Sequence, residues 1–246
     1  MKIALMQPYF LPYIGYFSLI KHTDRFLLFD ECQYIKQGWI NRNRVQKQME
    51  GWTYIYVPLK KHSDKILIKD VLIDNTHDWK TKIKNQLILY KKTAPFYKPV
   101  VNILDSIFSF DYIDIVSLNK NSLVEINKYL NINTPIDVLS NLNLQYKKAN
   151  QPDEWGINVC KCMNDVTEFW NASGGIVFFD PNKYVSENVT LRFLTSIPVE
   201  YQQINSPFER YLSIIDVLMM NSIETVHQML DNYQLVSFDK NGVSCN

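Results

Sequence analysis

The chain has 246 residues, and its 26 Lys and Arg residues nearly balance its 25 Asp and Glu residues, giving a formal net charge of +1. This length is enough for a large buried core, and a 46% hydrophobic, 21% charged composition excludes a disordered protein. The near-neutral charge predicts no nucleic-acid partner, and the apolar runs fall short of the roughly 20 residues that a membrane span takes. We therefore expect a cytoplasmic protein. The spacing of the four cysteines matches no disulfide or zinc pattern, which favours reduced thiols and so the same location.

Strands dominate the predicted N-terminal part. Residues 3–7 and 25–30 are apolar runs that predict buried strands, and residues 16–22 between them have a helical pattern. Residues 52–59 and 66–73 carry alternating apolar side chains, which predicts two further strands. A strand, a short helix and a second strand in close succession are typical of a parallel α/β sheet.

Helical periodicity dominates the rest of the chain. It predicts helices over residues 76–92, 98–108, 112–130 and 152–165, with strands over residues 136–139 and 199–204. Ser206, Pro207 and Glu209 then combine a capping residue, a first-turn proline and a third-position acid, which predicts a helix start. That helix is expected to end near Asn221, and Ser222 is expected to cap the next one.

The alternation of strands and helices predicts an α/β fold with a mostly parallel, Rossmann-like sheet and helices on both faces. We expect a single domain over residues 1–246, in which residues 1–75 form the strand-rich part that carries the motif loops. Residues 76–246 are expected to be mainly helical with short added strands. Ligands of such sheets bind at the carboxyl ends of the strands, so residues 7–16 and 30–43 should lie on one rim.

An aromatic loop follows the first predicted strand. Residues 7–17 read Gln-Pro-Tyr-Phe-Leu-Pro-Tyr-Ile-Gly-Tyr-Phe, and the prolines and glycine interrupt any regular element. So many rings would expose costly apolar area unless they pack against a ligand or a neighbouring segment. The predicted substrate-binding residues of this loop are Gln7, Tyr9, Tyr13 and Tyr16. The alternative is a rigid structural loop that covers the end of the sheet.

A polar stretch follows the second predicted strand. Residues 30–44 hold carboxylates, amides, cations and two aromatic side chains. Arg and Lys side chains can clamp a diphosphate, Asn side chains suit sugar hydroxyls, and a Trp ring can stack on a base or a sugar. The predicted substrate-binding residues here are Lys36, Trp39, Asn41, Arg42 and Asn43. The alternative is a solvated charged turn.

His77 is the predicted general base, because an imidazole titrates near neutral pH and this one stands at a strand-to-helix junction. Asp30 is the alternative base, and Gln33 or a backbone amide is the expected oxyanion donor. His77 could equally be only the neighbour of a helix cap. The sequence forms typical of hydrolase, zincin, P-loop and dinucleotide sites are missing, and no metal site is predicted.

The two motifs resemble those of the WbqC-like family of bacterial proteins. The resemblance rests on residues 7–17 and on residues 30–43, which read Asp-Glu-Cys-Gln-Tyr-Ile-Lys-Gln-Gly-Trp-Ile-Asn-Arg-Asn. It extends to His77-Asp78-Trp79 and to residues 212–218, so it spans nearly the whole chain. Cys32 departs from the aliphatic residue more usual at this place, which argues against Cys32 as a nucleophile.

The resemblance implies work on nucleotide-activated sugars, since genes of this family sit among those for O-antigen and other surface polysaccharides. We expect a transferase that places an amino-acid-derived acyl group on the amine of a nucleotide-linked sugar. The acyl donor would be a thioester of coenzyme A or of an acyl carrier protein, with no tightly bound cofactor.

The opening of the chain also resembles the nucleotidyltransferase layout, in which H-x-G-H stands where this chain has Tyr13-Ile14-Gly15-Tyr16. Both histidines are tyrosines here, which argues against nucleotidyl transfer itself. The alternative function is therefore a catalytically degenerate, nucleotidyltransferase-like protein that binds nucleotide sugars or serves as a scaffold.

Overall fold

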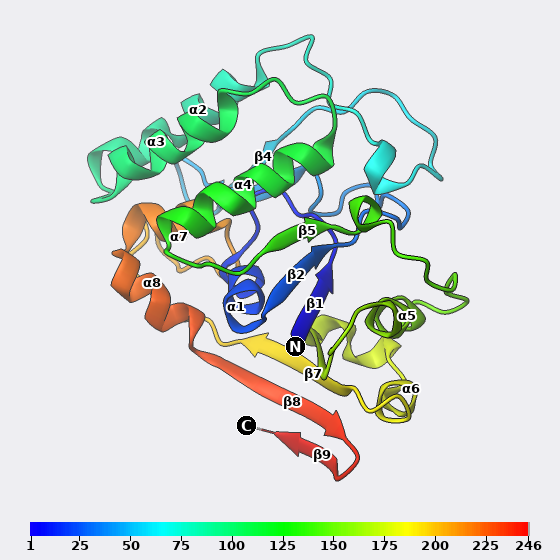
Figure 1. Ribbon diagram of the computed structural model, residues 1–246. Coiled ribbons are helices and arrows are strands. Elements are labelled where there is room, and N and C mark those ends of the chain that lie inside the picture. The colour runs from blue at the N-terminus through cyan, green and yellow to red at the C-terminus, as the bar shows by residue number, and fades with distance from the viewer. Residues whose placement is uncertain (246) are drawn as a thin grey trace.

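The sheet that organises the molecule is mostly parallel, as the sequence predicts. In the computed structural model, which describes residues 1–245, seven strands form this sheet in the order β5-β2-β1-β6-β7-β8-β9 (Figure 1). Their bounds in that order are Ile136–Val138, Arg25–Leu28, Lys2–Met6, Glu168–Ala172, Thr190–Ser196, Tyr233–Asp239 and Gly242–Cys245. The first five are parallel to one another, and β8 and β9 extend the sheet as antiparallel strands.

The strand order reverses direction at β1. The chain runs from β1 to β2 and on to β5 on one side, then returns to place β6 and β7 on the other side of β1. The carboxyl ends of β1 and β6 therefore flank a topological switch point, where open α/β sheets bind their ligands. Gln7 directly follows β1 at this point, and Ser173 directly follows β6.

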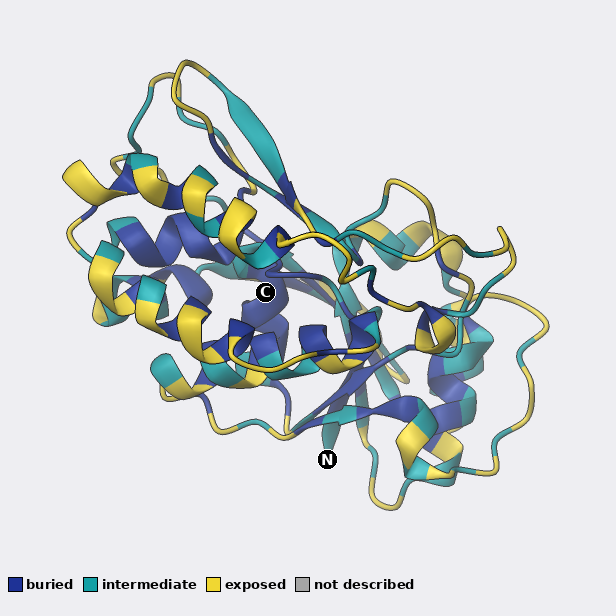
Figure 2. Ribbon diagram, turned by 90° about the horizontal axis from the view of Figure 1, so that it is seen from above, coloured by how far each residue is buried: buried dark blue, intermediate teal, exposed yellow. Residues whose placement is uncertain are grey.

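Helices cover both faces of the sheet, which confirms the predicted fold class. The α-helices α1 to α8 are Ile14–His22, Trp79–Leu87, Tyr97–Phe108, Ile115–Tyr129, Glu154–Cys162, Pro181–Val185, Ile214–Met220 and Ile223–Leu230. The 3-10 helices η1 to η4 are Ile68–Asp70, Ile88–Lys92, Leu139–Leu142 and Ser173–Phe178. Figure 2 shows helices that are buried along one side and exposed along the other. No helix within residues 1–245 is both long enough and apolar enough to cross a bilayer.

Successive residues of β1 and β2 pack into two separate hydrophobic cores, one on each face of the sheet. Ala4, Phe26 and Leu28 pack into the larger core with α1, α3, α4, α7 and α8. Ile3 and Leu27, which point to the opposite face, pack into a smaller core with α5 and α6. A strand buried on both faces must be apolar at every position, which explains why β1 and β2 were visible as apolar runs.

A two-stranded hairpin stands outside the main sheet. It pairs β3 (Arg42–Gln46) with β4 (Trp52–Tyr56) in antiparallel register. In Figure 1, β4 lies on the side to which β1 and β2 point. β3 was not predicted, because its two arginines resemble a polar loop more than a strand.

The predicted strand over residues 66–73 is wrong. This segment contains η1 and makes only isolated bridges, in which Leu67 pairs with Gln33, Leu72 with Asp114, and Ile73 with Leu59. Its partners thus lie on three different segments, so no continuous ladder can form. The apolar alternation reflects the burial of single side chains and not strand pairing.

Two predictions near the C-terminus are also wrong. Residues 199–204 form no strand, and the sheet strand of this region is β7, which ends before them. The helix expected from Ser206 begins only at Ile214, where the Ser213 hydroxyl accepts a hydrogen bond from the Ile215 amide. The Glu209 amide instead donates to the Gln203 side chain (2.8 Å), so a tertiary contact replaces the first turn.

The second half also holds more strand than its helical periodicity predicts. β7 and β8 are the longest strands, with seven residues each, and β6, β7, β8 and β9 were not predicted as strands. The predicted cap at Ser222 is confirmed, since its hydroxyl accepts from the Thr225 amide (3.2 Å) at the start of α8.

Candidate functional site

One face of the β3–β4 hairpin interleaves cations with aromatic rings. Strand alternation puts the side chains of Arg42, Arg44, Gln46, Trp52, Tyr54 and Tyr56 on this face, which we call the hairpin face. The Arg42 guanidinium lies 4.2 Å from the centre of the Tyr54 ring, and that of Arg44 lies 5.1 Å from the Trp52 ring. Asn43, Val45 and Ile55 point the other way and are buried.

The open end of the hairpin face borders a groove of about 430 Å³. Pockets of this size accommodate small molecules. The groove is lined by Tyr34, Lys36, Gln37, Asn41, Arg42, Tyr54, Tyr56, Leu59 and His62. Three of the predicted binding residues, Lys36, Asn41 and Arg42, therefore lie together.

Arg42 is held in place before any ligand arrives. Its Nε donates to the Gly38 carbonyl (3.2 Å), a second guanidinium nitrogen donates to the Gln37 carbonyl, and the group stacks on Tyr54. A guanidinium has five N–H donors, so these two bonds leave donors for a ligand anion. Lys36 is 65% exposed and pairs with Asp64 at 2.5 Å, a contact that water and salt weaken.

Asn41 positions Tyr34 in the wall of the groove. Its Oδ1 accepts from the Tyr34 hydroxyl (2.8 Å), and its Nδ2 donates to the Val57 carbonyl (2.9 Å). Burial raises the pKa of Tyr34, and the nearby Arg42 opposes that rise. Asn41 thus has a structural role in the wall of the groove, and its expected contact with sugar hydroxyls stays a prediction.

His62 also lines the groove, although no role was predicted for it from the sequence. Its ring meets the Tyr34 ring edge to face, with centroids 5.1 Å apart, and its Nδ1 lies 3.0 Å from the Ser63 carbonyl oxygen. Tyr54 and Tyr56 were missed as well. The signal that could have revealed them is the alternation in residues 52–56, opposite the alternating arginines of residues 42–44.

Three predicted site residues are buried and engaged by the protein itself. Asp30 is 1% exposed, and its two carboxylate oxygens accept from the Ser140 amide (3.1 Å) and hydroxyl (2.5 Å). Asn43 donates to the Phe10 carbonyl (3.0 Å), and the fully buried Tyr16 donates to the Gln7 carbonyl (2.8 Å). These side chains position the two motif loops, so the expectation that they contact substrate does not agree with their burial.

The two loops are also tied to each other. The Phe10 amide donates to the Trp39 carbonyl (2.9 Å), and the buried Asn119 of α4 donates to the carbonyls of both Pro8 (2.7 Å) and Ile40 (2.8 Å). The Arg44 guanidinium lies 5.4 Å from the centre of the Trp39 ring. Asn119 was not among the predicted site residues, because nothing local distinguishes it from the other polar residues of α4.

The aromatic loop that follows β1, residues 7–17, carries no charged side chain. Gln7 donates to the Cys32 sulfur (3.3 Å), Tyr9 packs on Tyr16, and Tyr13 meets Tyr211 edge to face. Burial raises the pKa of the Cys32 thiol to about 11 and that of Tyr13 to about 12. Cys32 is therefore protonated at neutral pH and unsuited to be a nucleophile. Without a cation of its own, this loop is a poorer diphosphate site than the groove.

Gln33 borders the groove, whereas His77 lies outside its lining. Gln33 is exposed next to the groove, and its Nε2 donates to the Asp64 carbonyl (2.7 Å), next to the Lys36 pair. His77 is exposed in the turn before α2, where it lies near Asp74. His77 is not part of the groove lining, and its described contacts do not include Asp30.

The other end of the hairpin face is closed by a buried polar group. The Asp216 carboxylate accepts from the hydroxyls of Tyr90 and Tyr201, and the Gln46 side chain bonds to Gln203 (3.1 Å). We call Gln46, Tyr90, Tyr201, Gln203 and Asp216 the Asp216 network. Burial raises the pKa of Asp216 to about 6 despite these hydrogen bonds.

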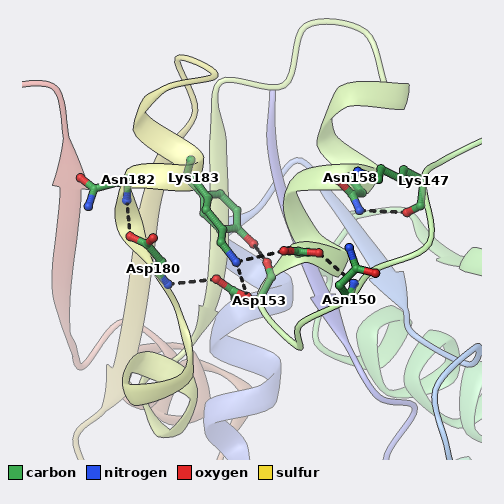
Figure 3. Close-up of polar contacts among 9 residues, drawn as sticks. Lys147, Asn150, Asp153, Asn158, Asp180, Asn182 and Lys183 are labelled. Carbon is green, nitrogen blue, oxygen red and sulfur yellow. Dashed lines mark hydrogen bonds and ion pairs between the residues drawn. The ribbon is translucent and has the colours of Figure 1, made fainter.

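A third polar cluster joins α5 to α6 on the face of the sheet that carries the smaller core (Figure 3). Lys183 bonds to Asp153 (3.0 Å) and Glu154 (3.2 Å), and the Asp180 amide donates to Asp153 (3.1 Å). Because its lysine is held between two carboxylates, this cluster suits a structural role better than the binding of an anion.

Comparison with known proteins identifies one family. The family model described as "WbqC-like protein family" matches residues 7–228. The chain is 29% identical over 220 residues to the uncharacterized protein Rv1507c of Mycobacterium tuberculosis (strain ATCC 25618 / H37Rv), an alignment that covers 88% of this chain and 92% of that protein. No solved structure matches the chain.

Proposed function

The chain belongs to the WbqC-like protein family, and from this membership we propose that it is a transferase that acts on a nucleotide-activated amino sugar. The groove at the open end of the hairpin face would bind the nucleotide part of this substrate. The pathway is the biosynthesis of surface polysaccharides, which the motif resemblance implies.

The observation that carries the proposal is the convergence of tyrosine rings and cations in one groove. Tyr56, which is 44% exposed, offers ring surface to a nucleobase, and stacking of this kind contributes about 1–3 kcal/mol per base. Arg42 and Lys36 supply the positive charge that a diphosphate needs. The arginine is pre-oriented by backbone carbonyls, so binding orders few further side-chain torsions.

The proposed reaction is N-acyl transfer from a thioester of coenzyme A or of an acyl carrier protein to the sugar amine. The tetrahedral intermediate of this reaction needs a hydrogen-bond donor for its oxyanion. Gln33 is the proposed donor, because its Nε2 has a second hydrogen besides the one directed at Asp64.

A binding experiment and a turnover experiment test the proposal. We expect UDP or dTDP to bind in isothermal titration calorimetry, and mass spectrometry to detect acylated UDP-glucosamine after incubation with acetyl-coenzyme A. Lys161→Gln is the control for charge, because Lys161 is an exposed cation of α5 that pairs with Glu187. Failure of every nucleoside diphosphate to bind at millimolar concentration would contradict the proposal.

The second candidate is a protein that binds nucleotide sugars without turning them over. Its support is the number of motif side chains engaged internally, namely Tyr16, Asp30 and Asn43. The same two experiments separate the candidates, since this one predicts binding without any acylated product.

A further inference from the structure

We infer that His62 is the general base that takes the proton from the attacking sugar amine. This inference rests on the transferase function proposed above. His62 is half-buried in the wall of the groove, where the nucleotide sugar would bind.

Local geometry selects the tautomer that a base requires. The Nδ1 of His62 lies 3.0 Å from the Ser63 carbonyl oxygen, which can only accept a hydrogen bond. Nδ1 therefore carries the hydrogen, and in the neutral ring Nε2 holds the lone pair that accepts a proton. The edge-to-face contact with Tyr34 fixes the plane of the ring (5.1 Å, 81°).

The other histidines are placed less well for this role. His22 contacts the Ser18 carbonyl (2.8 Å) and Asp231 (3.0 Å), and the Nε2 of His227 contacts the Leu130 carbonyl (2.7 Å). His77 lies outside the groove lining. Asp30, the alternative base, already accepts two hydrogen bonds from Ser140 in the core.

Charged and hydroxyl groups of the groove surround His62. The charged groups around His62 are Lys36, Arg42 and Asp64, and the hydroxyl groups are those of Tyr34, Tyr54 and Tyr56. His62 is close enough to Asp64 to contribute to the lowered pKa of that carboxyl, although Lys36 contributes more.

The step balances in atoms and electrons. The amine nitrogen forms a bond to the thioester carbonyl carbon, and the carbon–sulfur bond breaks. The proton lost by nitrogen goes to Nε2 of His62 and then to the departing thiolate. The products are an amide on the sugar and a free thiol.

Kinetics of the full-length protein test the inference. Turnover of UDP-glucosamine with acetyl-coenzyme A should fall about 10²–10⁴-fold in His62→Gln, with little change in the KM of the nucleotide sugar. The rising acidic limb of the kcat/KM profile should disappear, and added imidazole should restore part of the turnover of His62→Ala. Lys61→Gln is the control, since Lys61 is an exposed neighbour that does not line the groove.

A second measurement does not depend on turnover. Diethylpyrocarbonate should modify His62 in the free protein, and bound UDP should protect it, as followed by peptide mass spectrometry. If the wild-type protein acylates the sugar and His62→Gln retains that turnover, the inference is wrong while the proposed function stands. Loss of turnover in His77→Gln instead would assign the base to His77. If the wild-type protein shows neither binding nor acylation, both proposals fail.

Discussion

The two ends of the hairpin face share one sequence pattern and have opposite environments. At the closed end, Gln46 is fully buried, and its side-chain oxygen accepts from the Ile204 amide (2.7 Å). At the open end, Arg42 and Tyr56 face the groove, and Tyr56 is 44% exposed. The difference arises because residues 201–205 and α7 cover one end only.

This contrast separates polar residues that build the fold from those available to a ligand. In the Asp216 network, each side chain bonds to another part of the chain, so a ligand would have to displace an existing partner. In the groove, the cations keep unused donors and Tyr56 keeps exposed ring surface. Polar composition alone does not distinguish the two ends, whereas the hydrogen-bond partners do.

Removal of the Asp216 carboxylate should give the largest effect on stability. Asp216→Ala leaves the hydroxyls of Tyr90 and Tyr201 without their acceptor in the core, so we expect the free energy of unfolding to fall by about 2–4 kcal/mol. Urea denaturation monitored by circular dichroism measures this change in the free energy of unfolding. The control is Asp105→Ala, which removes only an exposed pair with Lys84 and should cost less than about 1 kcal/mol. Equal losses in the two variants would contradict the structural role of the network.

The same carboxyl group should make stability depend on pH. Burial raises the pKa of Asp216 from its ordinary value of 3.8 to about 6, so between these values the folded chain holds a proton that the unfolded chain has released. The resulting stabilisation is fully present below the unfolded pKa and is lost as pH rises through the folded pKa. The stability of the wild type relative to Asp216→Asn should therefore fall between about pH 4 and pH 6 and stay level above that range. A relative stability that rises with pH over this interval would reverse the assignment.

At the open end, loss of Arg42 should weaken ligand binding. Charge-assisted hydrogen bonds contribute about 1.5–3 kcal/mol, so the Kd for UDP should rise about 10- to 100-fold in Arg42→Gln. Arg42→Lys should recover only part of the affinity, because lysine keeps the charge and loses the planar fork. Calorimetry at two salt concentrations checks the result, with Lys161→Gln as the remote control. An unchanged Kd in Arg42→Gln would remove the groove as the nucleotide site.

The local sequence pattern predicted strands β1 and β2 correctly. It failed to predict the secondary structure of segments whose conformation depends on contacts with residues far away in the sequence. The helix expected from Ser206 is absent because the Glu209 amide bonds to Gln203, a partner that a capping pattern does not take into account. β3 was hidden because the burial of Asn43 and Val45 depends on β4 and on the aromatic loop.

The sequence predicted which types of residue the candidate site contains, but it predicted their positions in the fold only in part. The polar stretch did supply Lys36 and Arg42 to one groove. The sequence could not show that Asp30 is satisfied by Ser140, because the two residues are 110 positions apart and meet only when β2 pairs with β5. For the same reason His62 was overlooked, since its value as a base depends on the groove around it.

The ring of Tyr54 should contribute the smallest of these effects. It supports Arg42 through a contact of 4.2 Å, and exposed cation–π contacts contribute about 0.5–1 kcal/mol. Tyr54→Leu should therefore raise the Kd for UDP by about 2- to 5-fold. Tyr54→Phe keeps the ring and should bind like the wild type, which makes it the matched control in the same titration. If Tyr54→Phe loses as much affinity as Tyr54→Leu, the hydroxyl and not the ring is what the groove uses.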